Sequence, residues 1–265
     1  MSVFAKKFDK VIILTLETSD LDRLLQYYQN FFDKDDIYFM TVKNENDGLA
    51  SANEGNLDTS LWDILCHRTV DNISRAILKN HISMIQYAYN QNYNTVLFLE
   101  DDARFPAPEK MSKNMINAID SMIHHTNHIE WDILYLGHCP WPILFSYPVS
   151  RHVVKVFTPL TSHSYILQKN GMKKIFEFFH DNIESVQHLH IDKLFCRIKN
   201  LKKYAMFPSI CFQEKDPALF TKAMDFCGLS IQFVFFSRMM EMIAIIMPFL
   251  IMVAVLLFFY FTLKS

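Results

Sequence analysis

The stretch of sequence that decides the fold is Thr95-Val-Leu-Phe-Leu-Glu-Asp-Asp102 (TVLFLEDD). Its first five residues are a continuous apolar run, which is typical of a parallel strand covered by helices on both faces. Glu100, Asp101 and Asp102 follow this run directly. We therefore expect a central strand whose carboxyl end carries three carboxylates.

Strands and helices are predicted to alternate on both sides of this stretch. Apolar runs predict further strands at 11–16, 37–42, 132–136, 153–157 and 164–167. Helices are predicted at about 21–32, where Asp20 can cap the start, and at 70–90, where apolar residues recur at helical spacing. Two further helices are predicted at about 106–125 and 171–180. Alternation of this kind favours an α/β domain with a mostly parallel central sheet. The polar segment Lys43–Ser60 is long enough to be a lid over a binding site.

The composition excludes several classes of protein. A formal net charge of −2 gives the chain no general attraction to nucleic acid, so we expect no nucleic-acid partner. With only five glycines, the sequence contains neither GxGxxG nor GxxxxGK[ST]. Any bound nucleotide must therefore be held without a glycine-rich phosphate loop.

The C-terminal stretch Met242–Phe261 contains twenty residues without a charged side chain. A helix of that length spans ~30 Å, which is the thickness of a bilayer core. The alternative is a buried core helix, although globular helices rarely stay apolar on every side for so long. We expect a catalytic domain over 1–225, a juxtamembrane segment over 226–241 and a transmembrane helix over 242–263.

The predicted location is a membrane, through a single-pass C-terminal anchor with the catalytic domain in the cytosol. No secretory signal is visible at the N-terminus, where the apolar run Val11–Leu16 is only six residues long. The five cysteines are odd in number and scattered, which favours free thiols in a reducing compartment.

The acidic end of the central strand is the strongest chemical signal. Side chains alternate across a strand, so Glu100 and Asp102 are expected to point the same way. Open α/β sheets bind their ligands at the carboxyl ends of the strands. Two carboxylates held there favour a hard cation such as Mn²⁺ or Mg²⁺ between them, unless they form a solvated acidic surface.

The sequence also resembles the family 25 glycosyltransferases, which include lipooligosaccharide and procollagen galactosyltransferases and occur in large DNA viruses. VLFLEDDARF (96–105) and WDILYLG (131–137) carry the resemblance in combination. Weaker segments agree in order: VIILTLETSDLDR ending at Arg23, Asn80-His81, SHSYILQKNG (162–171), Ile191-Asp192 and FPSICFQ (207–213). Asn80 replaces the family's usual serine, and the Gly-Cys expected before it is absent.

The resemblance implies a GT-A-like fold and a metal-dependent transfer of a hexose, with galactose as the family's example. The donor would be a UDP-sugar and the acceptor a hydroxyl of a glycan or protein. Asp192 would act as the catalytic base, and Glu100 and Asp102 would hold Mn²⁺ or Mg²⁺. The residues expected to contact substrates are Arg23, His81, Asp101, Asp132 and Tyr165.

Other interpretations of these residues stay open at this point. His81 and Tyr165 can be ordinary core side chains, and Asp132 can cap a turn. His188, His190 and Asp192 would share one face of a strand and could bind zinc, which would favour a metal-dependent hydrolase. A third possibility is a degenerate transferase scaffold that binds a nucleotide sugar without transferring it.

Overall fold

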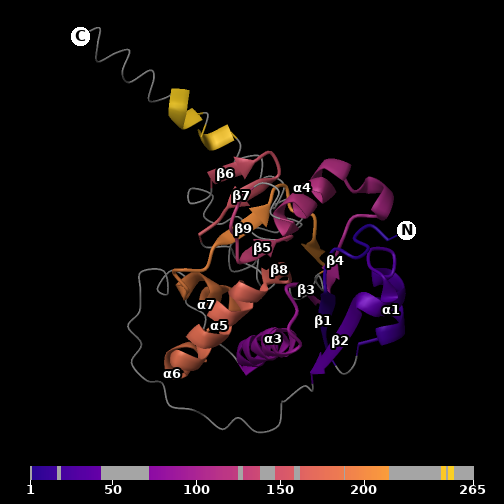
Figure 1. Cartoon of the computed structure of the whole chain (residues 1–265), viewed down its shortest axis with the longest axis vertical. Helices are drawn as coiled ribbons and strands as arrows, with labels where there is room; N and C mark the ends of the chain where they lie inside the picture. The colour runs from indigo at the N-terminus through magenta and orange to yellow at the C-terminus, as the bar shows by residue number, and fades with distance from the viewer. Residues whose placement is uncertain are drawn as a thin grey trace, which may run out of the picture.

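The computed structural model describes residues 2–16, 19–42, 72–124, 128–137, 147–157, 162–187, 189–214, 246–248 and 250–253. These residues form a mixed α/β fold around an eight-stranded sheet (Figure 1). Two strands run opposite to the other six, so the sheet is mostly parallel, as the sequence predicts.

The sheet has the strand order β2-β1-β3-β8-β5-β9-β7-β6. The strands, in that order, are Ile37–Val42, Lys10–Leu16, Thr95–Glu100, Ser164–Gln168, Ile133–Tyr135, Lys203–Met206, Val153–Lys155 and Tyr147–Ser150. Strands β8 and β7 are the reversed ones. A separate two-stranded antiparallel sheet pairs β4 (Ala103–Arg104) with β10 (Phe212–Gln213).

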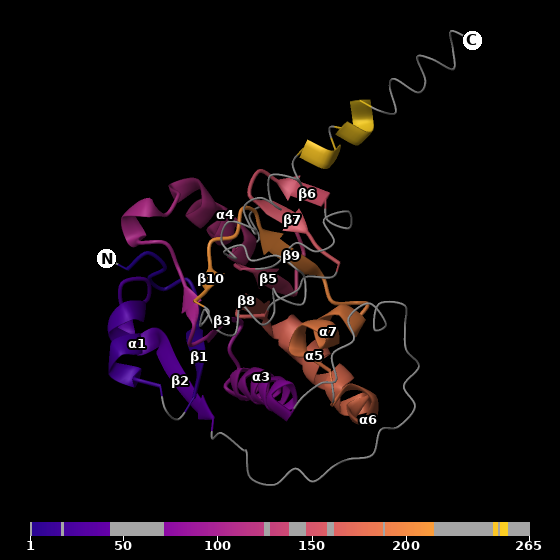
Figure 2. The same ribbon diagram turned by 180° about the vertical axis from the view of Figure 1, so that it is seen from behind.

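Helices cover both faces of the large sheet (Figures 1 and 2). The helices are α1 (Leu21–Tyr28), α3 (Asn72–Asn90), α4 (Lys113–Ile123), α5 (Lys169–Asp181), α6 (Ile183–Val186) and α7 (Ile191–Arg197), with short 3-10 helices at Lys34–Asp36 and Pro108–Lys110. One core contains residues of α1 and α4, and the other contains residues of α3, α5 and α7. Continuous apolar strands such as β3 are buried from both sides by this arrangement.

The chain changes direction around β1, and this change matters for the site. Helix α1 leads from β1 to β2 and buries Leu24 and Tyr28 against one face of the sheet. Helix α3 precedes β3 on the other side of β1 and buries Leu78 and Ile85 against the opposite face. The carboxyl ends of β1 and β3 therefore meet at a topological switch point, where open α/β sheets bind ligands.

The predicted transmembrane helix at 242–263 is wrong. Within the described part of the chain, no helix is long and apolar enough to cross a membrane. Of the predicted span, the structure describes residues 246–248 and 250–253, which are helical. The absence of a spanning helix from the described residues contradicts the single-pass anchor and the membrane localisation drawn from it. The juxtamembrane segment 226–241 and the polar segment Lys43–Ser60 lie outside the described residues.

Candidate functional site

The acidic turn, Glu100–Asp102, lies at the switch point of the sheet. Strand β3 ends at Glu100, and Asp101 and Asp102 form a turn that leads into β4. The hydroxyl of Ser19, in the segment between β1 and α1, donates a 2.6 Å hydrogen bond to Oδ2 of Asp101. This bond ties the acidic turn to the neighbouring strand end, so the two sides of the switch point are in direct contact.

The carboxylate of Glu100 contacts His81, which in turn contacts Tyr165, and both are predicted site residues. His81, fully buried on α3, has Nε2 3.3 Å from Oε1 of Glu100 and Nδ1 2.8 Å from the hydroxyl of Tyr165 on β8. An ionised carboxylate only accepts hydrogen bonds, so we assign to His81 the tautomer that donates from Nε2 to Glu100 and accepts from Tyr165 at Nδ1. Burial raises the pKa of Tyr165 well above its ordinary value, and the charge of Glu100 adds to the shift. The tyrosine therefore stays protonated and able to donate.

Further contacts fix Glu100 from the other directions. The side-chain amide of Gln213, on β10, donates a 3.1 Å hydrogen bond to Oε2 of Glu100. The backbone N–H of Glu100 donates to the carbonyl of His163, and the hydroxyl of Tyr28 lies 3.2 Å from the carbonyl of Glu100. The Glu100 side chain nevertheless remains 21% exposed. It is thus an oriented carboxylate with part of its surface open.

Asp102 has different surroundings from Glu100. Because β3 ends at Glu100, the alternation that would place both side chains on one face stops there. Burial raises the pKa of Tyr28 and that of Cys211, the latter to about 12, and the charge of Asp102 adds to both shifts. Tyr28 and Cys211 belong to the core on the α1 face, whereas His81 lies on α3. Strand alternation therefore does not by itself bring the two predicted metal ligands together.

The residues of the turn fit a cation only if the substrate completes its coordination. Among the described residues, no group of three or more His, Cys, Asp or Glu could hold a metal ion. Mg²⁺ and similar cations in nucleotide sites often take one or two carboxylates from the protein and the remaining oxygens from phosphates and water. The acidic turn can supply that smaller number of ligands.

Asp132 lies away from the acidic turn. It directly precedes β5, which runs in the same direction as β3. Asp132 is therefore at the amino ends of these strands, whereas the acidic turn is at their carboxyl ends. Its buried carboxylate accepts hydrogen bonds from Asn170 Nδ2 (2.9 Å), Lys174 Nζ (2.6 Å) and the backbone N–H of Lys202 (2.8 Å). These contacts join β5 to α5 and to the chain before β9.

Arg23 is an exposed residue in the first turn of α1, which begins next to the switch point. Its backbone N–H donates a 3.1 Å hydrogen bond to Oδ1 of Asp20, the N-cap residue of the helix. The helix start therefore follows the capping pattern expected from the sequence. The Arg23 side chain is therefore on the surface, near the carboxyl end of β1.

Asp192 lies in the first turn of α7, and His190 is the N-cap residue of that helix. An HxHxD metal site needs these residues on a strand, and His190 and Asp192 are not on one. His188 lies outside the described part of the chain. Burial raises the pKa of Tyr135, and the charges of Cys196 and Asp192 add to that shift. Residues of α7 and α3 belong to the same core cluster. Asp192 and His81 are therefore on helices that cover the same face of the sheet.

Four residues at the turn are not among those predicted from the sequence: Ser19, Arg104, Gln213 and Glu214. Arg104 Nη2 forms a 2.5 Å ion pair with Oε2 of Glu214, and the backbone N–H of Glu214 donates to the carbonyl of Asp102. Gln213 lies in the FPSICFQ segment that resembles the family, which is the one signal that could have identified it. Arg104 and Ser19 also lie in quoted segments, VLFLEDDARF and VIILTLETSDLDR, whereas Glu214 lies in none of them.

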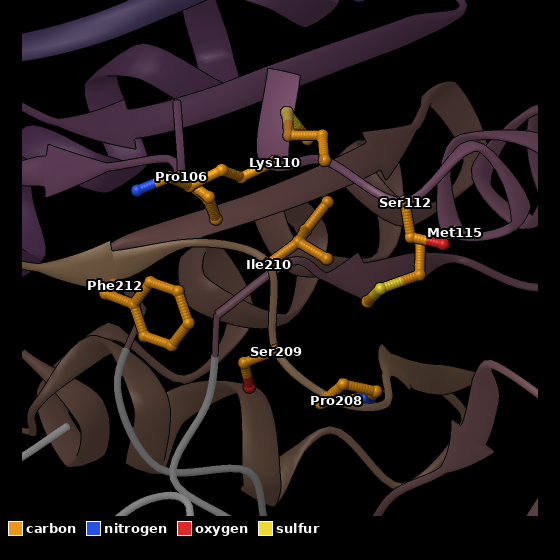
Figure 3. A pocket seen from close by; sticks show the side chains of 9 residues that line it. Pro106, Lys110, Ser112, Met115, Pro208, Ser209, Ile210 and Phe212 are labelled. Carbon is orange, nitrogen blue, oxygen red and sulfur yellow. The ribbon is translucent and has the colours of Figure 1, made fainter. Parts of the chain in front are cut away.

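A pocket of about 120 Å³ lies between the segment that follows β4 and the segment that leads into β10 (Figure 3). Its lining comes from 106–115 and 208–212 and includes Met115, Ile210 and Phe212. Pockets for drug-sized ligands have volumes of roughly 300–1,000 Å³, so this one is too small for a nucleotide sugar. It adjoins the candidate site through Phe212, which pairs with Arg104.

Two solved structures are distantly similar to this chain. No known protein family and no curated protein matches the chain. The crystal structure of A197 from STIV is 9% identical with a TM-score of 0.40, over 78% of this chain and 86% of that one. A glycosyltransferase involved in the glycosylation of the major capsid of PBCV-1 is 9% identical with a TM-score of 0.27, over 82% of this chain and 99% of that one. At this distance neither likeness assigns a family or an activity, and the resemblance to family 25 stays a prediction.

Proposed function

We propose that the protein is a glycosyltransferase that moves a hexose from a UDP-sugar to an acceptor hydroxyl with the help of Mn²⁺ or Mg²⁺. The observation that carries this proposal is the position of the acidic turn at the β1/β3 switch point, where Ser19 and Asp101 are in contact. Ligands of open α/β sheets bind at such points. A run of three carboxylates there suits a diphosphate that arrives with a divalent cation.

The proposal gives each residue of the turn a role. Glu100 and Asp102 are the candidate ligands of the cation, and Asp101 is the candidate contact for the ribose or the sugar. His81 and Gln213 act as positioning residues, because both donate to Glu100. When bound, the cation would neutralise the charge that develops on the departing diphosphate.

Asp192 is the candidate general base in this proposal. A general base must come within hydrogen-bond reach of the acceptor hydroxyl, directly or through one water. Asp192 is half-buried at the start of α7, and its Oδ1 accepts a 2.8 Å hydrogen bond from the backbone N–H of Lys193.

A donor screen tests the proposal directly. The purified chain would be incubated with a panel of UDP- and GDP-sugars and Mn²⁺, and nucleoside diphosphate release would be measured with and without EDTA. We expect release from one donor, abolished by EDTA and reduced in Glu100→Gln. An absence of release from every donor, with the cation present and a range of sugar and peptide acceptors, would contradict transferase activity.

A second function is favoured by one observation and uses the same site. Both oxygens of Glu100 already have partners, since Oε1 lies near His81 and Oε2 accepts from Gln213. A carboxylate engaged in this way suits a protein that binds a nucleotide sugar without transferring it. Calorimetry with UDP-sugars would support this alternative if binding is measurable while the donor remains intact over hours.

A further inference from the structure

Arg104 is held in a fixed position directly beyond the acidic turn. Its Nη1 donates to the backbone carbonyls of Asp101 (2.7 Å) and Ala103 (3.0 Å). Its guanidinium carbon lies 5.1 Å from the centroid of the Tyr27 ring, within the range of a cation–π contact. One edge and one face of the guanidinium group are therefore occupied by the protein.

Tyr27 is itself fixed, which makes the arrangement rigid. The Tyr27 hydroxyl accepts a 2.7 Å hydrogen bond from the backbone N–H of Phe105 and lies 3.2 Å from the carbonyl oxygen of the same residue. Burial raises the pKa of Tyr27, so the hydroxyl keeps its proton. The ring under Arg104 consequently cannot turn without breaking contacts to the chain that follows β4.

The remaining edge of Arg104 faces a carboxylate that the protein supplies. Nη2 lies 2.5 Å from Oε2 of Glu214, whose side chain is 59% exposed, while that of Arg104 is 29% exposed. An ion pair with an exposed partner is weak and exchanges with other anions, because solvent screens it. The backbone N–H of Glu214 is bonded to Asp102, so the Glu214 side chain can rotate away without displacing β10.

We propose that the Nη2 edge of Arg104 is an anion site for the diphosphate of the nucleotide sugar, and that the carboxylate of Glu214 occupies this site until the ligand displaces it. The identity of the ligand rests on the proposed function. A planar guanidinium matches two phosphate oxygens at once, and a preorganised one loses little freedom on binding. The acidic turn places three carboxylates just before Arg104 in the chain, so a diphosphate should bind here only with its divalent cation.

Isothermal titration calorimetry on the full chain tests this site. The probes are UDP with Mn²⁺ and inorganic pyrophosphate with Mg²⁺. We expect Glu214→Gln to bind both about threefold or more tightly, because a neutral amide competes less well for the guanidinium. We expect Arg104→Gln to bind about tenfold or more weakly than the parent chain. Arg104→Lys, which keeps the charge without the planar group, should have an affinity between those of the parent and Arg104→Gln.

Two comparisons make the result decisive. The double variant Arg104→Gln, Glu214→Gln should bind as weakly as Arg104→Gln, since Glu214 competes only for Arg104. Glu130→Gln removes another exposed carboxylate from its ion pair with Lys202 and should leave both affinities unchanged. If Glu214→Gln and Arg104→Lys both bind like the parent chain, the inference is overturned, even if Arg104→Gln fails to fold.

The outcome for this site can be separated from the outcome for the proposed function. Pyrophosphate binding that shifts as expected, without turnover of any donor, would support the anion site and count against transferase activity. Sugar transfer combined with unchanged pyrophosphate and UDP affinities in Glu214→Gln and Arg104→Lys would support the enzyme and refute the anion site.

Discussion

At the scale of single residues, the first prediction concerns the carboxylates of the acidic turn. Asp102→Asn removes one negative charge with little change of volume, and should weaken a hard cation bound with a diphosphate. Loss of one strong electrostatic contact to a transition state costs on the order of 10²–10³ in rate. We expect a loss of that size in transfer rate, measured at several Mn²⁺ concentrations, with partial recovery at the highest.

Asp101→Asn is the matched control for this prediction. Its carboxylate accepts from Ser19 and is assigned to the sugar rather than the cation. We expect it to raise the KM for the donor without changing the Mn²⁺ dependence. A transfer rate for Asp102→Asn within threefold of the parent at every Mn²⁺ concentration would refute Asp102 as a metal ligand.

The second prediction at this scale concerns Asp132, to which the resemblance gives a substrate contact. Its carboxylate is buried, pairs with Lys174 and caps the backbone N–H of Lys202. Removing one partner of a buried ion pair costs roughly 3–5 kcal/mol. We expect Asp132→Asn to lower the free energy of unfolding by about 2–4 kcal/mol in urea, since Lys174 is partly solvated.

If Asp132 has this structural role, the folded fraction of the variant should keep the parent's KM for the donor. Lys174→Met, which removes the other partner, should destabilise the chain while leaving that KM unchanged. A stable Asp132→Asn variant with a raised KM would instead indicate contact with the donor.

At the scale of elements, the packing of α5 on β5 gives a prediction for Gly171. A Cβ at this position would lie 2.5 Å from the carbonyl oxygen of Asp132, which is backbone and cannot rotate away. Overpacking of this kind costs roughly 1–3 kcal/mol and outweighs the helix preference of alanine, which is at most about 1 kcal/mol. Gly171→Ala should therefore lower the urea midpoint.

Lys173→Ala, an exposed change two residues further along α5, is the control and should alter the free energy of unfolding by less than about 0.5 kcal/mol. A Gly171→Ala variant as stable as the parent would mean that α5 can shift away from β5 without cost.

The elements with a clear hydrophobic period were predictable from the sequence. The continuous apolar run before Glu100 became β3, and the helical spacing between residues 70 and 90 became α3 (Asn72–Asn90). Order and direction were not predictable, because they depend on pairing between distant segments. The reversed strand β8 between β3 and β5 has the same apolar character as a parallel strand. Strands β4 and β10 have two residues each, too few for any period.

The candidate site was predictable in part for the same reason. The resemblance pointed to Glu100, His81 and Tyr165, and the fold joins these three by hydrogen bonds. Gln213 lies 113 residues from Glu100 along the chain, so no local pattern could link them. The zinc alternative required His188, His190 and Asp192 to lie on a strand, but Asp192 is in the first turn of a helix whose buried residues include Leu194 and Phe195.

At the scale of the whole molecule, the site depends on the complete sheet. The segments that meet at the acidic turn are the chain between β1 and α1, the middle of α3, the end of β3, the start of β8, and β10. Contacts between segments so far apart form only when the sheet has closed around them. Local opening of the turn without loss of the sheet is therefore limited to side chains at its surface, such as Glu214.

The whole molecule also carries an excess of buried acids that are neutral at physiological pH: Tyr28, Tyr135, Tyr165, Cys196 and Cys211. Burial raises the pKa of each, to about 11 for Cys196 and about 12 for Cys211. Unfolded cysteine and tyrosine ionise near pH ~8.5 and ~10. Above pH ~9 the folded chain therefore binds more protons than the unfolded chain, and stability must fall as the pH rises.

We expect the free energy of unfolding, from urea titrations at pH 8, 9.5 and 10.5, to fall steadily across this range. Each retained proton contributes about 1.4 kcal/mol per pH unit. Lys203 opposes the trend, because burial lowers its pKa and the folded chain loses this proton first. It is one group against the five tyrosines and cysteines named above. Tyr135→Phe is the informative variant, since the Tyr135 hydroxyl has no hydrogen-bond partner among the described residues. It should be at least as stable as the parent at pH 8, because a buried hydroxyl without a partner costs stability, and should lose less stability by pH 10.5. Equal stability of the parent chain at pH 8 and 10.5 would show that these side chains reach solvent when they ionise.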